Sequence, residues 1–119
     1  MSFVKVEAVV IRERIETVID AVEEQAGHVG VTVIEAVGHG RQRGITHEYR
    51  GRTFESRFLP KALLVFVTKE ERAAAVVEAV VDAARSGNES GDGIVWTTPA
   101  ENVMHNRTGR ALEEVEVAA

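Results

Sequence analysis

VGVTVIEAVGHGRQRGITHEYRGRTFESRFLPKALLVFV, residues 29–67, is the stretch that decides the fold. Two apolar, β-branched runs, 29–37 and 58–67, flank a polar segment that begins with Gly-X-Gly at Gly38 and ends in Leu-Pro-Lys at Lys61. Five arginines fall within this segment. Loops longer than about 12–15 residues in compact domains are mostly functional or disordered. We therefore predict two strands joined by a long loop that carries the function.

Two further strands are expected outside this stretch. Residues 3–11 alternate at first and then become continuously apolar, which is typical of a central strand. Residues 94–97 form a short apolar run that we expect to break at Pro99. Within the stretch itself, residues 63–67 are continuously apolar and indicate a fully buried strand.

Two helices are expected as well. Apolar residues recur at helical spacing after Ile15, and Gly27 is a plausible helix terminator. Thr68 and Glu71 match the S/T-x-x-E capping box, which predicts a second helix that begins at Thr68 and runs to about Arg85.

The resulting order, β-α-β, long loop, β-α-β, predicts an α+β fold of the ferredoxin-like type. It consists of a four-stranded antiparallel sheet with two helices on one face, in a single domain over residues 1–119. Valines such as Val4, Val31 and Val65 suggest that both faces of the sheet are apolar. Self-association is the natural cover for the second face.

Composition excludes several classes of function. The net charge of −5 argues against general nucleic-acid binding, which depends on neutralising phosphates. The chain has no cysteine, so disulfides and thiol chemistry are not available to it. It shows neither a signal-peptide pattern nor an apolar run long enough to span a membrane, and we expect a cytoplasmic protein without membrane insertion.

Three polar segments with glycines are candidates for an anion site: 38–42 (GHGRQ), 87–93 (GNESGDG) and 106–109 (NRTG). Glycines at strand ends let backbone N–H groups approach an anion, and successive amides can cradle phosphate oxygens. Arg107 can add a charge-assisted contact. Each motif alone has low specificity.

Taken together and in this order, these motifs resemble the PII signal-transduction family over nearly the whole chain. Residues 38–44 (GHGRQRG), 49–51 (YRG) and 58–61 (FLPK) resemble the family's T-loop and its two feet, the loop itself covering about 41–57. Gly91-Asp92-Gly93 resembles the B-loop, at about 86–93, and Arg107-Thr108-Gly109 the C-loop signature, within about 101–119.

The resemblance implies a homotrimer that binds adenine nucleotide (ADP, AMP or ATP) in the clefts between subunits and has no catalytic cofactor. The implied nucleotide-binding residues are Thr32, Gly38, Gly40, Gln42, Val67, Gly91, Asp92, Gly93, His105 and Arg107. Gln42 and Lys61 match the positions that hold Mg²⁺ and 2-oxoglutarate beside ATP. The T-loop, with Arg50, Arg52 and Phe54 as target contacts, would control a membrane transporter or a metabolic enzyme.

Four departures from the family pattern change what is expected. Phe54 replaces the tyrosine that is modified in some members, and Arg52 replaces a phosphorylatable serine, so ligands rather than modification should control the loop. Ile94 follows the B-loop motif where a lysine is usual, and His105 replaces a basic residue. Each missing charge-assisted contact is worth about 1.5–3 kcal/mol. Because the γ-phosphate of ATP carries the most outlying charge, the missing cations weaken ATP binding most. We therefore expect a site that prefers ADP or AMP over ATP, or that discriminates poorly between them, and the same departures put 2-oxoglutarate sensing in doubt.

Other functions stay open at this stage. Two classes of target are compatible with the sequence: one in ammonium transport and nitrogen assimilation, and one in carbon metabolism, for example a bicarbonate transporter. The sequence does not separate them. A metal-binding trimer of the divalent-cation-tolerance type is disfavoured by the lack of clustered ligands, since His39, His47 and Glu48 fit no established metal pattern. A structural trimer with a degenerate nucleotide site is a third alternative. No set of nucleophile, base and orienting residue indicates an enzyme.

Overall fold

The computed structural model describes residues 2–39, 46–49, 52–55, 58–86 and 92–112, with the backbone alone at 46–49 and 52–55. In chain order the elements are β1 (Phe3–Ile11), the 3₁₀ turn η1 (Arg12–Arg14), α1 (Ile15–Ala26), β2 (Val31–Gly38), β3 (Thr46–Tyr49), β4 (Arg52–Glu55), β5 (Leu59–Lys69), α2 (Glu70–Ala84), β6 (Ile94–Ala100), β7 (Met104–His105) and β8 (Arg110–Ala111).

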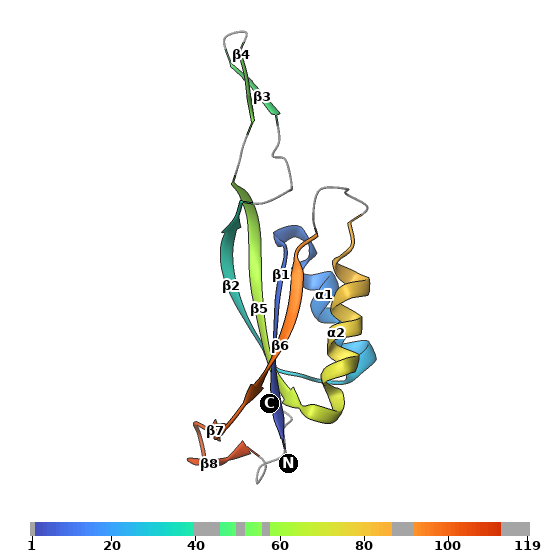
Figure 1. The fold of residues 1–119 in the computed structure, drawn as a ribbon, viewed down its shortest axis with the longest axis vertical. Coiled ribbons are helices and arrows are strands. Elements are labelled where there is room, and N and C mark those ends of the chain that lie inside the picture. The colour runs from blue at the N-terminus through green and yellow to red at the C-terminus, as the bar shows by residue number, and fades with distance from the viewer. Residues whose placement is uncertain (1, 40–45, 50–51, 56–57, 87–91, 113–119) are drawn as a thin grey trace.

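The main sheet has four strands in the order β2-β5-β1-β6, and every neighbouring pair is antiparallel. Both helices lie on one face of this sheet (Figure 1). The predicted ferredoxin-like βαββαβ fold is therefore confirmed. Two short hairpins are added to it: β3–β4 projects beyond the end where β2 meets β5, and β7–β8 lies past the opposite end of β6 (Figure 1).

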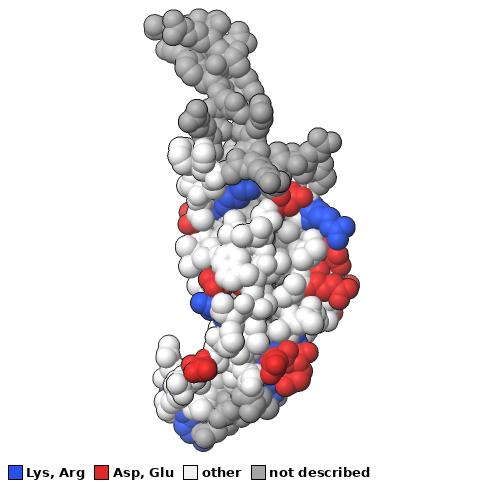
Figure 2. All heavy atoms as spheres, in the orientation of Figure 1, with Lys and Arg blue, Asp and Glu red and all other residues white. Residues whose placement is uncertain are grey.

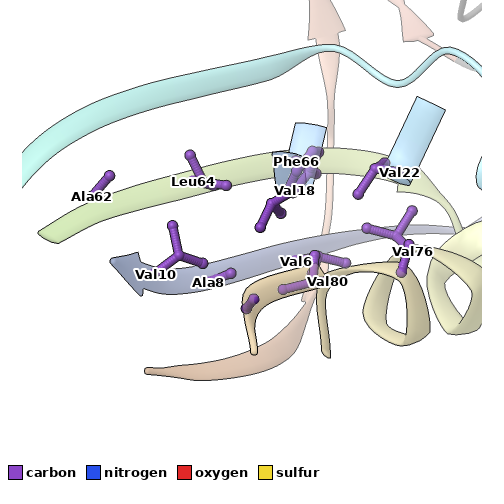
Figure 3. Packing of buried hydrophobic residues seen from close by; sticks show 12 residues of the cluster. Val6, Ala8, Val10, Val18, Val22, Ala62, Leu64, Phe66, Val76 and Val80 are labelled. Carbon is purple, nitrogen blue, oxygen red and sulfur yellow. The ribbon is translucent and has the colours of Figure 1, made fainter. Parts of the chain in front are cut away.

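The core lies between the sheet and the two helices. Alternate residues of β1 and β5 point to the helices, as the two-residue period of a strand requires. Figure 3 shows them meeting valines of α1 and α2. The largest fully buried side chains are Val6, Val10, Val18, Val22, Leu64, Phe66, Val76 and Val80.

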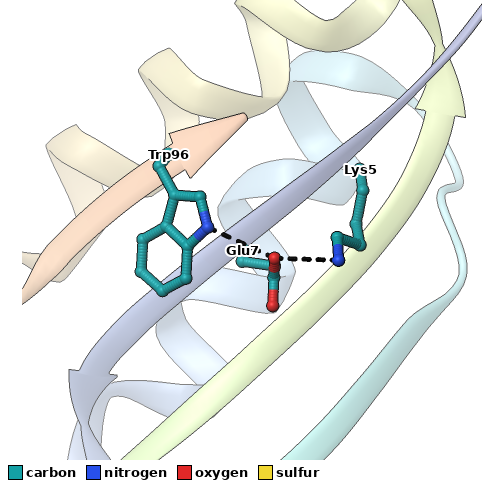
Figure 4. Close-up of polar contacts among 3 residues, drawn as sticks. All are labelled: Lys5, Glu7 and Trp96. Carbon is teal, nitrogen blue, oxygen red and sulfur yellow. Dashed lines mark hydrogen bonds and ion pairs between the residues drawn. The ribbon is translucent and has the colours of Figure 1, made fainter. Parts of the chain in front are cut away.

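The opposite face of the sheet, which we call the open face, is not covered by the helices. Its central row, in register across the four strands, is Thr32, Val65, Glu7 and Trp96. Glu7 receives a hydrogen bond from the Trp96 indole Nε1 at 3.2 Å and forms an ion pair with the Lys5 ammonium at 3.1 Å (Figure 4). Uncharged residues occupy most of the middle of the face seen in Figure 2.

The end of the first helix agrees with the sequence, but the start of the second does not. Gly27 follows α1 with a φ of 81°, a conformation that a glycine adopts at little cost. The capping box expected at Thr68 is wrong: Thr68 is a buried residue of β5, and Lys69 precedes α2 without a side-chain cap. The strand continues through Thr68 because this residue pairs with Val4 of β1.

Two strands are longer than the sequence suggested. β5 runs from Leu59 to Lys69, and it is not fully buried, since alternate residues face the open face. β6 continues through Pro99, which pairs with Val4, so the expected break is also wrong. Since β6 is an edge strand, a residue without a backbone N–H can be accommodated there.

Candidate functional site

Four predicted site residues meet at the end of the sheet nearest the β3–β4 hairpin: Gly38, Lys61, Asp92 and Gly93. We call them the loop-foot cluster. Gly38 is the last residue of β2, and Lys61 lies near the start of β5, so both stand at the feet of the long loop. A Cβ added to Gly38 would lie 2.7 Å from Cγ of Lys61. The missing side chain of Gly38 therefore leaves room for that of Lys61.

Lys61 is a buried cation, with only 7% of its surface exposed. Burial lowers the pKa of its ammonium group, and the nearby Asp92 carboxylate partly opposes this by raising that pKa. Asp92 itself accepts a hydrogen bond of 2.5 Å from the Ser86 hydroxyl. The long loop and the 86–93 loop are thus linked electrostatically where they leave the sheet.

Gly93 closes the cluster against the central strand β1. Its φ of +90° lies in the region that glycine tolerates, and a Cβ at this position would stand 1.7 Å from the carbonyl oxygen of Val9. Only a glycine fits this close approach. The backbone that leads from the 86–93 loop into β6 is consequently placed against β1 by the absence of a side chain.

The other described candidates lie away from this end of the sheet, and we call them the distal set: Thr32, Val67, His105 and Arg107. Thr32 is exposed near the start of β2, and Val67 lies near the end of β5. Gly38 follows Thr32 by six positions along β2, which corresponds to about 20 Å of strand. One chain therefore does not bring the distal set and the loop-foot cluster around a single ligand.

His105 is the last residue of β7, and Arg107 lies in the turn of the β7–β8 hairpin. The Gly109 amide donates a hydrogen bond to the His105 carbonyl at 2.8 Å, and Arg107 is exposed. The Nδ1 atom of His105 is buried, and among the described residues nothing hydrogen-bonds to it. Because a buried polar atom without a partner is costly, this nitrogen is a candidate for contact with a ligand or a second subunit.

Several predicted residues cannot be placed. Gly40, Gln42, Arg50 and Gly91 lie outside the described residues. The predicted limits of the long loop, at about 41 and 57, also lie outside them. Arg52 and Phe54 belong to β4, whose backbone alone is described. The predicted target contacts and the Gln42 position beside Mg²⁺ therefore remain predictions.

Sequence reasoning missed two contacts that the structure shows. The first is the contact of Trp96 with Glu7, although a charged residue such as Glu7 within a mainly apolar strand is a signal for a partner on the open face. The second is Arg12, whose guanidinium group reaches the feet of the long loop. A basic residue in the short turn after β1 carries no pattern that predicts such a contact.

The described residues contain neither a cluster of metal-ligating side chains nor a membrane-spanning helix. In the parts of the chain that the structure describes, no three His, Asp or Glu side chains are grouped to hold a metal ion. Neither helix has the length and apolar character needed to cross a lipid bilayer.

The fold and the loop-foot cluster define a ferredoxin-like protein whose long inter-strand loop has a charged, glycine-marked base. Residues 3–110 match the family model described as "Nitrogen regulatory protein P-II". The chain belongs to this P-II family, a family of signal-transduction regulators rather than enzymes.

Curated relatives and a solved structure agree with this assignment. The chain is 41% identical to nitrogen regulatory protein P-II of Rhizobium meliloti, over 88% of this chain and 92% of the relative. It is 39% identical to nitrogen regulatory protein P-II 2 of Methanothermobacter thermautotrophicus, over 93% and 96% respectively. The crystal structure of Arabidopsis thaliana PII bound to citrate superimposes with a TM-score of 0.74 at 30% identity, covering 97% of this chain and 92% of that one.

Proposed function

We propose that this protein is a homotrimeric P-II-type regulator that binds adenine nucleotide between its subunits and controls a partner protein through the 41–57 loop. The observation that carries the proposal is the loop-foot cluster. Its residues come from the feet of the 41–57 loop and from the end of the 86–93 loop, the two loops expected to contact the nucleotide, and the 41–57 loop is also the one expected to bind the partner. A ligand bound there contacts the two feet directly, so its binding energy can differ between two arrangements of the loop.

The electrostatics of the cluster suit an anionic ligand. Lys61 is a buried ammonium group whose protonation is disfavoured by desolvation. A phosphate or carboxylate placed beside it would favour the charged form, which is the condition for a strong charge-assisted contact. In the family pattern, Lys61 and Gln42 hold 2-oxoglutarate and Mg²⁺ beside ATP, and we retain both as candidate effector residues.

A second subunit is needed to complete the site. The distal set lies away from the loop-foot cluster of its own chain, with Thr32 about 20 Å from Gly38 along β2, so it would serve a ligand that another chain's loop-foot cluster holds. The open face, with half-buried Val65 and exposed Trp96 in its central row, provides the surface on which subunits pack. In a closed ring of three chains, each cleft would take the loop-foot cluster from one subunit and the distal set from its neighbour.

The proposed preference among AMP, ADP and ATP depends on the residues that replace two expected cations of the site. Ile94, directly after Gly93, is 69% exposed and provides an apolar surface where a cation would contact an outer phosphate. His105 stands where the family pattern has a basic residue, so a lasting positive charge is missing there. We therefore propose that ADP or AMP binds at least as tightly as ATP at neutral pH.

The partner is proposed to bind the tip of the long loop. The β3–β4 hairpin extends this loop away from the body of the protein (Figure 1), and β4 carries Arg52 and Phe54. With Arg50, they would present basic and aromatic groups to an acidic or amphipathic surface. We propose a cytoplasmic location and, as the target, an ammonium transporter or a nitrogen-assimilation enzyme. A carbon-linked target such as a bicarbonate transporter is the alternative.

Calorimetric titration with AMP, ADP and ATP, each with and without Mg²⁺ and 2-oxoglutarate, tests the proposal. We expect one nucleotide per subunit and an ATP affinity no higher than that for ADP. Failure to bind any of the three at millimolar concentration would refute nucleotide binding and favour a structural trimer. ATP binding clearly tighter than ADP would refute the proposed preference while leaving the site intact.

A further inference from the structure

Arg12 connects the first strand to both feet of the long loop. It lies in η1, directly after β1, and its Nε donates a hydrogen bond to the Lys61 carbonyl at 3.1 Å. Its Nη2 donates to the Ala36 carbonyl at 2.7 Å. Ala36 and Lys61 are register partners on β2 and β5. A single guanidinium group therefore binds two strands at the same level of the sheet.

This pair of residues lies at the base of the loop-foot cluster. Lys61 is a member of the cluster, and Ala36 is two residues before Gly38 in the chain. On β2 and β5 only two further residue pairs separate the Arg12 contacts from the loop, ending with Gly38 opposite Leu59. Because the N–H groups of a guanidinium have a fixed fork geometry, two simultaneous bonds also set the relative position of the two carbonyls.

We propose that Arg12 is a positioning residue for the loop-foot cluster. It holds the ends of β2 and β5 together, so that Lys61 and Gly38 present one arrangement to the ligand, and it makes no contact with the ligand itself. The positioning is a property of the ligand-free protein. Its effect on nucleotide affinity rests on the proposed function, because loosening the strand ends lowers the fraction of chains ready to bind.

Arg14 provides a matched control within the same turn. Its Nε and Nη2 donate to the Ala83 carbonyl at 3.0 and 2.6 Å, at the end of α2. It therefore makes the same number of guanidinium–carbonyl bonds as Arg12, but to a helix end rather than to the loop feet. Arg14→Gln removes comparable bonding and leaves the cluster in place.

The experiment compares amide hydrogen exchange in the full-length wild type, Arg12→Gln, Arg12→Lys and Arg14→Gln, all without ligand. In Arg12→Gln we expect exchange at Gly38 and Lys61 to accelerate at least about tenfold, with the core of β1 unchanged. Arg12→Lys should resemble it, because one ammonium cannot reproduce the paired, fixed bonds. In Arg14→Gln the acceleration should instead appear at the end of α2.

Calorimetry with ADP on the same four proteins gives the functional readout. We expect affinity to fall about tenfold or more in Arg12→Gln and to change less than twofold in Arg14→Gln. Unchanged exchange at the strand ends in both Arg12 variants, or equal effects of Arg12→Gln and Arg14→Gln there, would overturn the positioning role. If the exchange result holds but the wild type binds no ADP, the positioning role stands and the proposed function fails.

Discussion

Substituting Gly93 by alanine is the perturbation whose effect the structure specifies most sharply. The φ of +90° places an L-residue in an unfavourable backbone region, at a cost of about 1–2 kcal/mol. The new Cβ would also stand 1.7 Å from the Val9 carbonyl oxygen and 2.7 Å from its carbon. Both atoms belong to the backbone of a central strand, so relief requires movement of β6 or β1, typically at about 1–3 kcal/mol.

The two contributions sum to a loss of about 2–5 kcal/mol in the free energy of unfolding. For a chain of this length, 1 kcal/mol corresponds to about 4 °C in melting temperature, so Gly93→Ala should melt about 8–20 °C below the wild type. Differential scanning calorimetry at matched protein concentration measures this, since assembly makes melting temperatures concentration-dependent.

Gly109→Ala is the control for this experiment. Gly109 has a similar positive φ of 68°, but no heavy atom of the described residues lies within 4 Å of an added Cβ. It therefore reports the backbone strain alone, about 1–2 kcal/mol. If Gly93→Ala were no less stable than Gly109→Ala, the close approach of Gly93 to Val9 would be wrong, and with it the placement of Gly93 against β1.

Three further predictions concern the buried lysine, the open face and the core. Because burial lowers the Lys61 pKa below its ordinary value of 10.5, the unfolded chain binds this proton more tightly. The free energy of unfolding should therefore rise with pH between the pKa of Lys61 in the folded protein and 10.5. Urea titrations at several pH values should show a smaller rise in Lys61→Met than in the wild type, and an equal rise would contradict the effect of burial. Val65→Asp should give monomers in analytical ultracentrifugation, because an unpaired carboxylate is costly in a subunit interface. The fluorescence emission of Trp96 should shift to the red as the open face becomes exposed to water. Intact trimers would argue against packing through the open face. Leu64→Ala should lose about 2–5 kcal/mol in denaturant unfolding, as for a fully buried leucine, and a loss below 1 kcal/mol would contradict its place in the core.

The main elements could be predicted from the sequence because their signals are local. The two-residue period of β1 and the helical spacing of α1 both arise from burial of one side against a single core. The helix start predicted at Thr68 was wrong because the capping-box pattern considers only local sequence. Pairing with Val4 keeps Thr68 in β5. The strand end predicted at Pro99 was wrong for a related reason. A proline disrupts a central strand, and only the sheet topology shows that β6 is an edge strand.

The candidate site was predictable in composition but not in arrangement. The motifs identified Gly38, Lys61 and Asp92 individually, yet nothing in their spacing shows that Asp92 lies close enough to Lys61 to affect its pKa. The separation of the distal set from the loop-foot cluster was equally hidden, because it depends on strand direction. Arg12 has no motif at all: its contacts exist only once three elements are assembled.

A complementation experiment tests the central claim, that the site forms between subunits, most directly. Gly38→Val damages the loop-foot cluster and Arg107→Ala the distal set, and each homotrimer should be intact but unable to bind ADP. In trimers reassembled from an equal mixture, a mixed ring has one cleft built from two undamaged halves, so about a quarter of all sites should recover. Calorimetry should then measure wild-type affinity at about that stoichiometry. No recovery in mixed trimers whose formation is verified by mass spectrometry would contradict an inter-subunit site.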